Sequence, residues 1–253
     1  MLILFKKIRK YAIDSGRLTR YAAYAVGEII LVVIGILIAL KINDWDHANQ
    51  EAAFEIQVLE EIQANLNTDL IEIRDDISLM QQAESHSLSV LEFIKHEAKP
   101  NDTFNYSAAR LRLIPHFDET RSGYDLLESK GIGLIKNSTI RNNLSELYEK
   151  YYPYYSVYER ERMDFHREHN MPVILTYFYL PLDYTTNEDW LGYKYHITQE
   201  DFDRLKTDPH FVKVVHAYIF ENSSILKRAK RMEGMIIALI DKIQIELESL
   251  SAS

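Results

Sequence analysis

The run YAVGEIILVVIGILIALKINDW, Tyr24–Trp45, is the one long, nearly uncharged apolar stretch of this 253-residue chain. Between Tyr21 and Leu40 the sequence holds a single charged residue, Glu28. A helix needs about 20 apolar residues to cross a hydrocarbon layer of about 30 Å. The sequence therefore predicts a transmembrane helix over residues 21–43. Aromatic residues typical of membrane interfaces flank it, namely Tyr21, Tyr24 and Trp45.

A cleavable signal peptide is the main alternative for an apolar run that follows a basic N-terminus. Signal peptides have an apolar core of roughly 7–15 residues and then a small-residue cleavage site. Here the apolar core is longer, and the residues that follow it, KIND at 41–44, contain no such site. We therefore expect the run to be retained as a membrane anchor.

Charge is distributed unevenly on the two sides of the run. Residues 1–20 hold six basic residues and one acidic residue, whereas the remainder holds 23 basic and 37 acidic residues. Because positive charge marks the cytoplasmic side, we expect a cytoplasmic tail, 1–20, and an extracytoplasmic domain, 44–253. In a bacterial inner membrane that domain would be periplasmic. Residues 1–13 have the pattern of an interfacial amphipathic helix, and a disordered basic tail is the alternative.

The composition excludes several kinds of site. The chain has no cysteine, so it can have no disulfide, catalytic thiol or cysteine-based metal site. Nucleic acid is disfavoured as a partner of the acidic domain, because its binding depends on neutralising phosphates. With only eight Gly and six Pro residues the chain contains few helix breakers, and we predict an all-α fold.

Two long helices frame the predicted bundle. The transmembrane helix is expected to continue into the first, which ends near Ala98. Its apolar stripe weakens at Ala83 and Ser87, so we expect it to pack against later helices of this chain rather than in a two-stranded coiled coil. The second starts at Asp208-Pro209, ends near Leu250 and runs antiparallel to the first. The predicted core positions are Leu59, Ile62, Leu66, Ile73, Ile77, Met80, Leu91 and Ile94 on the first, and Phe211, Val214, Tyr218, Ile225, Ala229, Met232, Ile236, Leu239, Ile243 and Leu250 on the second.

The section between the long helices is predicted to consist of short helices and loops. In order, we expect a helix over 107–114 stopped by Pro115, one over 123–130 capped by Ser122, one from Asn137-Ser138 to Tyr151, its continuation to His169, an ordered loop over 180–195, and a helix capped by Thr198. Pro153 is expected to kink or break its helix, and Pro172 to mark a boundary.

Within the span, small residues recur at every fourth position, with one exception. Such spacing lets two helices approach closely in lipid. Glu28 and Gly35 lie on one side of the helix, and a carboxyl group within the bilayer needs a partner. We expect Glu28 side chains to pair across a homo-oligomer; proton conduction or coupling to another membrane protein is the alternative. The predicted seam consists of Ala23, Gly27, Glu28, Leu31, Gly35 and Ala39.

Two groups of residues could carry a ligand. The tract YEKYYPYYSVYER contains tyrosines that could line an aromatic pocket, although aromatic rings with polar edges are more often core residues. The candidates are Tyr148, Tyr151, Tyr152 and Tyr155. His166 and His169 have a spacing that metal ligands can have on a helix, but Arg167 intervenes and a third ligand is missing. We expect no bound metal and no cofactor.

Motifs of common enzymes are missing from the sequence. It contains no glycine-rich phosphate loop, no G-x-S-x-G and no H-E-x-x-H. The carboxylates follow the polar faces of predicted helices. We therefore expect that the protein is not an enzyme.

The apolar run and a second stretch, SGYDLLESKGIGLIKNSTIRNNLSELYEKYY at Ser122–Tyr152, resemble an uncharacterised family of single-span bacterial membrane proteins, found mainly in Bacteroidetes. Its members are similar in their short basic tail, their GEI…VVIGILIAL span and its N-x-W end. In this chain an acidic DWDH follows the span instead of the usual exit. The resemblance implies a membrane-anchored protein of unknown function, and it transfers no functional residue.

Together these patterns predict a membrane-anchored helical interaction or scaffold protein of the bacterial envelope, oligomeric through its span. The expected partners are the lipid bilayer, further copies of this chain and other envelope proteins. The alternative is a sensor-like periplasmic ligand-binding module that signals through a partner, because a tail of 20 residues cannot hold an enzymatic output domain.

Overall fold

The computed structural model describes residues 18–180 and 193–252 of the chain. Over these residues it is helical, with one antiparallel bridge, between Tyr179 and His196, and no β-strand. The all-α prediction is therefore confirmed. The helices are α2 (Leu18–His96), α3 (Asp102–Arg110), α4 (Ser122–Lys130), the 3₁₀ turn η1 (Ile132–Leu134), α5 (Ser138–Ser145), the π-helical η2 (Glu146–Tyr151), α6 (Tyr152–Phe165), the π-helical η3 (His166–Asn170), α7 (Met171–Tyr177), α8 (Gln199–Thr207) and α9 (Pro209–Ser251).

The chain divides into two compact units, residues 1–55 and 56–253. In the first unit, the described part of α2 carries the apolar run, and its large apolar side chains from Val26 to Ile42 are 46–72% exposed. Among the described helices, α2 is the one with a segment long and apolar enough to cross a membrane. None of that segment is buried, which distinguishes it from the core helix of a soluble protein. The predicted interfacial helix over 1–13 lies outside the described residues.

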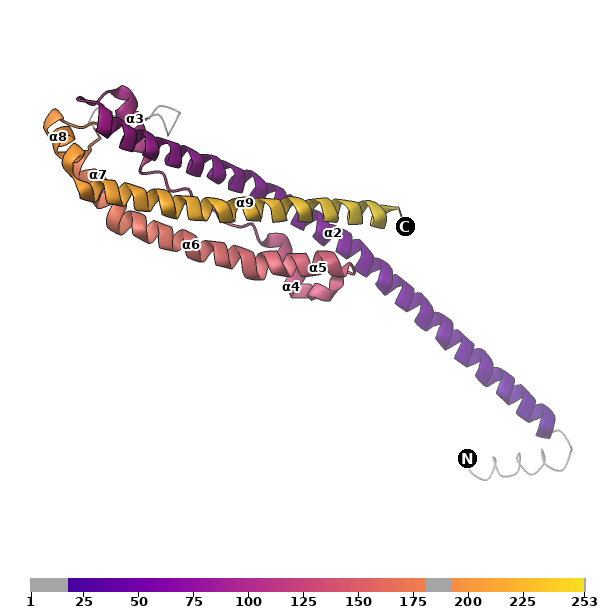
Figure 1. The fold of residues 1–253 in the computed structure, drawn as a ribbon. Helices are drawn as coiled ribbons and strands as arrows, with labels where there is room; N and C mark the ends of the chain where they lie inside the picture. Colours follow the sequence, from indigo (N-terminus) through magenta and orange to yellow (C-terminus); the bar gives the residue numbers. More distant parts are fainter. Residues whose placement is uncertain (1–17, 181–192, 253) are drawn as a thin grey trace. The chain divides into compact units, whose positions relative to one another are not determined.

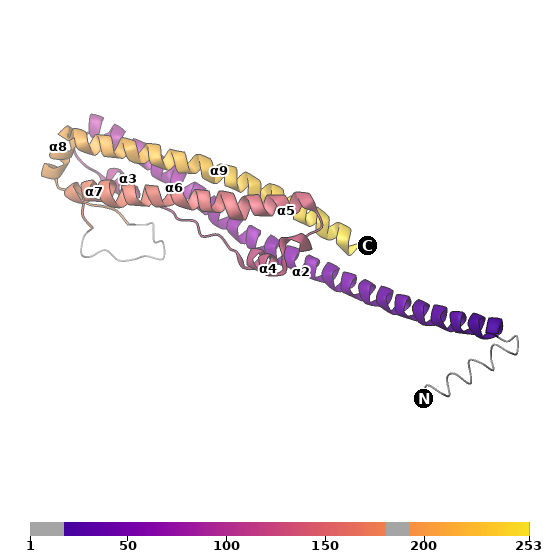
Figure 2. The same cartoon turned by 90° about the horizontal axis from the view of Figure 1, so that it is seen from below.

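The second unit is a helical bundle in which α9 runs antiparallel to residues 56–96 of α2 (Figures 1 and 2). Three hydrogen bonds fix the direction: Gln63 to Gln244 at 3.0 Å, Arg74 to Glu233 at 2.8 Å, and Asn222 to the Met80 carbonyl at 2.7 Å. As the residue numbers rise along α2, those of the partners on α9 fall. The predicted antiparallel packing is confirmed.

The predicted apolar stripes form the core of this bundle. Every predicted position on α2 is buried, and so is every predicted position on α9 except Leu250, which is half-buried next to the buried Leu247. At Ala83 and Ser87, where the stripe weakens, both residues are completely buried, and α2 packs there against later parts of this chain as predicted. Ala83 packs with Leu113 and Tyr218, so its small side chain leaves room for another segment of the chain.

The start signals of the last two helices work as predicted. The Thr198 hydroxyl accepts the Asp201 N–H at 3.0 Å and caps α8. The Asp208 carboxylate accepts the His210 N–H at 2.8 Å at the start of α9, where Pro209 is the first residue. Both contacts satisfy N–H groups that a helix leaves without a partner in its first turn.

The first two short helices differ from their predictions. The helix expected over 107–114 spans Asp102–Arg110 instead, because the Asn101 side chain accepts the Phe104 N–H at 2.8 Å and starts it earlier. The helix over 123–130 exists as α4, but the Ser122 hydroxyl does not cap it and donates to Asn65 Oδ1 at 3.1 Å. A Cβ on Gly123 would lie 2.8 Å from the Ile62 backbone nitrogen, so α4 approaches α2 as closely as glycine permits.

Neither Pro153 nor Pro172 interrupts the helix, contrary to expectation. Residues 138–177 form one succession of α- and π-helical segments, and each proline follows directly on the first residue after a π-helical segment. Proline has no N–H for the carbonyl four residues earlier, and single π-helical turns occur as insertions within α-helices. The wider turn before each proline lets the chain remain helical. The loop predicted over 180–195 falls largely outside the described residues.

Candidate functional site

The centre of the bundle contains a non-helical segment rather than another helix: residues 111–121, the extended segment, which begins with a turn at 111–112. Its side chains alternate between inside and outside: Leu111, Leu113, Pro115 and Phe117 are buried, while Arg112, His116 and Asp118 are exposed. This is the period-two pattern of a β-strand, yet no strand pairs with it among the described residues. Its backbone polar groups therefore need other partners.

Buried side chains of the surrounding helices supply those partners. Three backbone carbonyl groups of the segment accept hydrogen bonds. The Leu111 carbonyl accepts from the Asn170 amide at 2.8 Å, the Leu113 carbonyl from the Tyr218 hydroxyl, and the Pro115 carbonyl from the Arg162 guanidinium. The N–H groups of Phe117 and Thr120 donate to Glu159 Oε1 at 3.2 Å and Asp69 Oδ1 at 2.8 Å. An unpaired buried backbone group costs roughly 1–3 kcal/mol, so these side chains hold the segment in place.

Two carboxyl groups and one guanidinium lie together beside this segment. Asp76 of α2 is 6% exposed, and Glu159 and Arg162 of α6 are each 1% exposed. Glu159 Oε1 lies 3.9 Å from Arg162 Nη2. Burial raises the pKa of Asp76 to about 6, with a further rise from the Glu72 charge. Burial also raises the pKa of Glu159 to about 7, against the opposing effect of the His116 and Arg162 charges.

His116 connects Glu159 with the surface. It belongs to the extended segment and is 45% exposed, with Nδ1 3.4 Å from Glu159 Oε2 and Nε2 3.1 Å from Asp118 Oδ1. The Asp118 side chain is 84% exposed. The imidazole therefore has a buried carboxylate on one side and a solvated one on the other.

The structure separates the four candidate tyrosines. Tyr148, Tyr152 and Tyr155 are buried together, and Tyr148 stacks on Tyr124 with ring centroids 4.4 Å apart. The Tyr152 hydroxyl donates to Asp69 at 2.7 Å. Tyr151 points instead toward α9, where its hydroxyl accepts from Arg231 at 2.9 Å. The first three are packed as core residues around the extended segment.

The two candidate histidines also lie apart. His166 is buried, and its Nδ1 accepts from the Asn170 amide at 2.9 Å, while His169 is exposed and contacts the Phe165 ring. Burial lowers the pKa of His166 to about 4, with the Arg162 and Arg112 charges adding to the effect. Across residues 18–180 and 193–252, no three His, Asp or Glu side chains gather in a way that could hold a metal ion.

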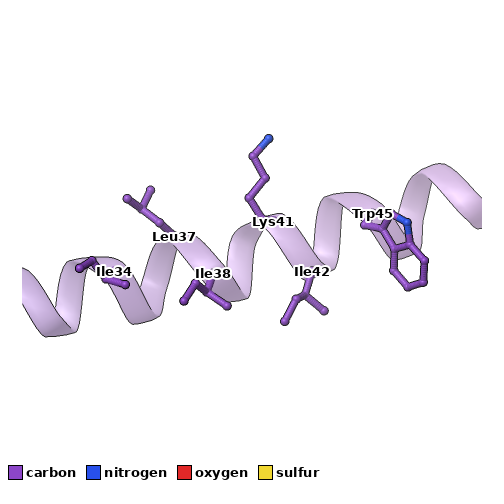
Figure 3. Close-up of a pocket in the computed structure, with 6 residues that line it drawn as sticks. All are labelled: Ile34, Leu37, Ile38, Lys41, Ile42 and Trp45. Carbon is purple, nitrogen blue, oxygen red and sulfur yellow. The ribbon is translucent and has the colours of Figure 1, made fainter.

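Most residues of the predicted membrane seam are exposed on α2. Gly27, Glu28, Leu31, Gly35 and Ala39 are solvent-exposed, and a Cβ built on either glycine meets nothing within 4 Å. The side chain of Ala23 lies outside the description. Toward the C-terminal end of the run, α2 carries a shallow, largely apolar pocket, and Figure 3 shows the side chains that line it: Ile34, Leu37, Ile38, Lys41, Ile42 and Trp45. Aliphatic residues that end in a lysine and a tryptophan are typical of a helix leaving the hydrocarbon layer.

The cluster of Asp76, His116, Glu159 and Arg162 was not among the residues singled out from the sequence. A signal for Asp76 was present, because it lies three residues after Ile73 and four before Met80 and so falls on the apolar stripe of α2. A carboxylate on such a stripe is buried. No comparable signal marks Glu159, which lies among other charged residues in YERERMD.

Comparison with known proteins gives one match. The model of DUF6090, a family of unknown function, matches residues 28–179, which include most of the apolar run and all of Ser122–Tyr152. No curated protein and no solved structure matches the chain. The matched residues make up more than half of the sequence, and this protein therefore belongs to the DUF6090 family of unknown function.

Proposed function

We propose that this protein is a single-span, membrane-anchored interaction module of the bacterial envelope that self-associates through its span. The observation that carries the proposal is the exposure of the apolar part of α2: a run whose large side chains are 46–72% exposed needs another apolar environment. A lipid bilayer fits the length and composition of the run. Bacterial origin of the Bacteroidetes type and an inner-membrane location are part of the proposal.

Charge supports the proposed orientation. The six basic residues before the run favour a cytoplasmic N-terminus, and the acidic remainder favours an extracytoplasmic bundle. In a cell with two membranes the bundle would lie in the periplasm. There, a packed helical domain without a catalytic motif suits binding of other envelope proteins better than chemistry.

The seam supports self-association. Gly27 and Gly35 present bare backbone on one side of α2, and close backbone approach is how small residues promote helix pairing in lipid. Glu28 lies next to this face. Its carboxyl group would gain a hydrogen-bond partner in a second copy, which removes the cost of leaving it alone in hydrocarbon.

Topology can be tested directly because the chain has no cysteine. We would introduce Ser15→Cys and Lys99→Cys separately and label cells with a membrane-impermeant maleimide after permeabilising the outer membrane. The proposal expects label at position 99 in these cells and at position 15 only after the inner membrane is lysed. The reverse pattern, or protein released from membranes by carbonate, would contradict it.

Self-association is tested with a matched pair of cysteines in the span. Leu31→Cys lies in the seam, whereas Val33→Cys lies on the opposite side of the same helix. Oxidative crosslinking in native membranes should give dimers with the first and few with the second. Equal crosslinking, or association unchanged by Glu28→Gln and Gly35→Leu, would remove the oligomer from the proposal.

Crosslinking with mass spectrometry separates this function from sensing. A scaffold is expected to contact envelope proteins through its bundle. A stable signalling protein bound at the tail or the span would favour the sensor instead, since transmission requires a cytoplasmic output.

A further inference from the structure

The cluster beside the extended segment contains four buried polar atoms without a hydrogen-bond partner. They are Asp76 Oδ2 on α2 and Tyr155 Oη, Glu159 Oε2 and Arg162 Nε on α6. The three residues of α6 are spaced four and three apart and therefore share one face of that helix. Buried polar groups are nearly always hydrogen-bonded, so the unpaired oxygens of Asp76 and Glu159 mark where a proton can be held.

Charge identifies what the site can hold. Arg162 is a single buried cation, and it can balance only one of the two buried carboxylates. A second ionised carboxylate would remain uncompensated in a medium of low polarity, where a charge is costly. The carboxyl group that Arg162 does not balance is most stable when it carries a proton.

We propose that Asp76 and Glu159 form a proton-binding site inside the bundle, one that takes up a single proton beside Arg162 and exchanges it with solvent through His116. The ligand is the proton itself. The site is independent of membrane anchoring and self-association.

His116 provides the route. Its two ring nitrogens face Glu159 on the inside and Asp118 on the outside, at 3.4 and 3.1 Å. A neutral imidazole can accept a proton at one nitrogen and release one from the other. No further side chain is needed between the buried carboxyl group and the solvated one.

Charged and polar groups on each neighbouring segment affect the protonation of Asp76 and Glu159 or contact Arg162. On α2, the carboxylates of Glu72 and Asp75 favour protonation of Asp76, and on α6 Arg162 opposes it. On the extended segment His116 favours ionised Glu159. From α9 the Asn222 amide oxygen accepts from Arg162 at 3.5 Å. The raised pKa values of Asp76 and Glu159, about 6 and about 7, agree with uptake near neutral pH.

The test uses infrared difference spectroscopy on the full-length protein in lipid nanodiscs, with pH steps between 8.5 and 5.5. All variants carry Glu28→Gln, so that a carboxyl group in the span does not contribute. The protein should show the C=O band of a protonated, buried carboxyl group that appears near neutral pH. Glu159→Gln or Asp76→Asn should remove or shift this band.

Glu161→Gln on α6 and Glu60→Gln on α2 serve as controls, because they change exposed carboxylates and should leave the band unchanged. If Glu159→Gln fails to fold, the site can still be followed in Asp76→Asn and in the protein that keeps both Asp76 and Glu159. Absence of the band at pH 6, or its persistence in both variants, would overturn the proposal.

The route is tested with His116→Gln. Proton uptake after a pH jump should slow, and the titration midpoint of the band should move to higher pH because a cation that favours ionised Glu159 is gone. The control His96→Gln changes an exposed histidine paired with Glu92 and should alter neither. Unchanged rate and midpoint in His116→Gln would exclude His116 as the route.

Discussion

The Tyr152 hydroxyl donates to Asp69 Oδ2 at 2.7 Å, in a part of the bundle where Asp69 is completely buried. The other oxygen of Asp69 accepts the Thr120 N–H at 2.8 Å. One carboxylate thus ties α2 to α6 and to the extended segment. The contact explains why a tyrosine rather than a phenylalanine stands at a core position.

Tyr152→Phe should destabilise the bundle by about 1–3 kcal/mol, because it leaves one oxygen of a buried carboxylate without its donor. Urea unfolding of the full-length protein in detergent, followed by circular dichroism, measures the change. Tyr154→Phe is the control: this residue is 50% exposed and its hydroxyl donates to Tyr158 at the surface, so its substitution should change the free energy of unfolding by no more than about 0.5 kcal/mol. Equal effects would show that the buried hydrogen bond contributes little.

Gly123→Ala should also destabilise the bundle, by about 1–3 kcal/mol. The new methyl group would lie 2.8 Å from the Ile62 backbone nitrogen and 2.9 Å from its side chain, so α4 would have to move away from α2. The same unfolding experiment applies. Gly234→Ala is the matched control within α9, where a Cβ meets nothing, and it should stabilise the helix by about 0.5–1 kcal/mol. A neutral Gly123→Ala would mean that α4 can shift without cost.

The long helices could be predicted from the sequence because their signals are repeated many times. The stripes on α2 and α9 extend over many turns, and Thr198 and Asp208 add cap signals of their own. The extended segment could not be placed, because LRLIPHFD is short and its alternation matters only where helices surround it. Such a segment has the pattern of a strand without a sheet.

The buried charges were equally hard to predict. Glu159 and Arg162 look like solvated helix residues in YERERMD, and only the packing of three segments around them shows that they are buried. Pro153 and Pro172 gave the opposite error. Proline chemistry predicts a break in the helix, but π-helical turns before each proline let the helix continue. Tertiary packing overrides local preference in each case.

Stability should fall as pH rises from about 4.5 to about 8, with most of the Glu159 contribution lost by about pH 7. The pKa of Glu159 is raised from 4.5 to about 7 in the folded state, so the folded protein binds more protons than the unfolded chain in this range. The stabilisation that protonated Glu159 gives to the folded state is present at lower pH and is lost as pH rises through the folded pKa. Full ionisation would cost on the order of 3 kcal/mol. Asp76, raised from 3.8 to about 6, acts in the same direction at lower pH.

Unfolding midpoints measured across this pH range check the prediction. Glu159→Gln should flatten the profile above pH 6.5, because the amide is neutral at every pH and can still accept the Phe117 N–H. Glu161→Gln should keep the slope of the unsubstituted protein. A flat profile in the unsubstituted protein would mean that Glu159 stays ionised when buried, in conflict with the direction of its pKa shift.

At lower pH His166 should act in the opposite direction. Its pKa is lowered from 6.5 to about 4 in the folded state, so the unfolded chain binds the extra proton, and stability is lost as pH falls from about 6.5 toward 4. The geometry agrees, because Nδ1 accepts from the Asn170 amide at 2.9 Å and a protonated ring could not accept there. Acid unfolding measured between pH 6.5 and 4 should be shallower in His166→Gln than in the unsubstituted protein, whereas His169→Gln, which changes an exposed ring, should leave it unchanged. Identical acid profiles for the two variants would show that the buried imidazole is not the group that limits stability in acid.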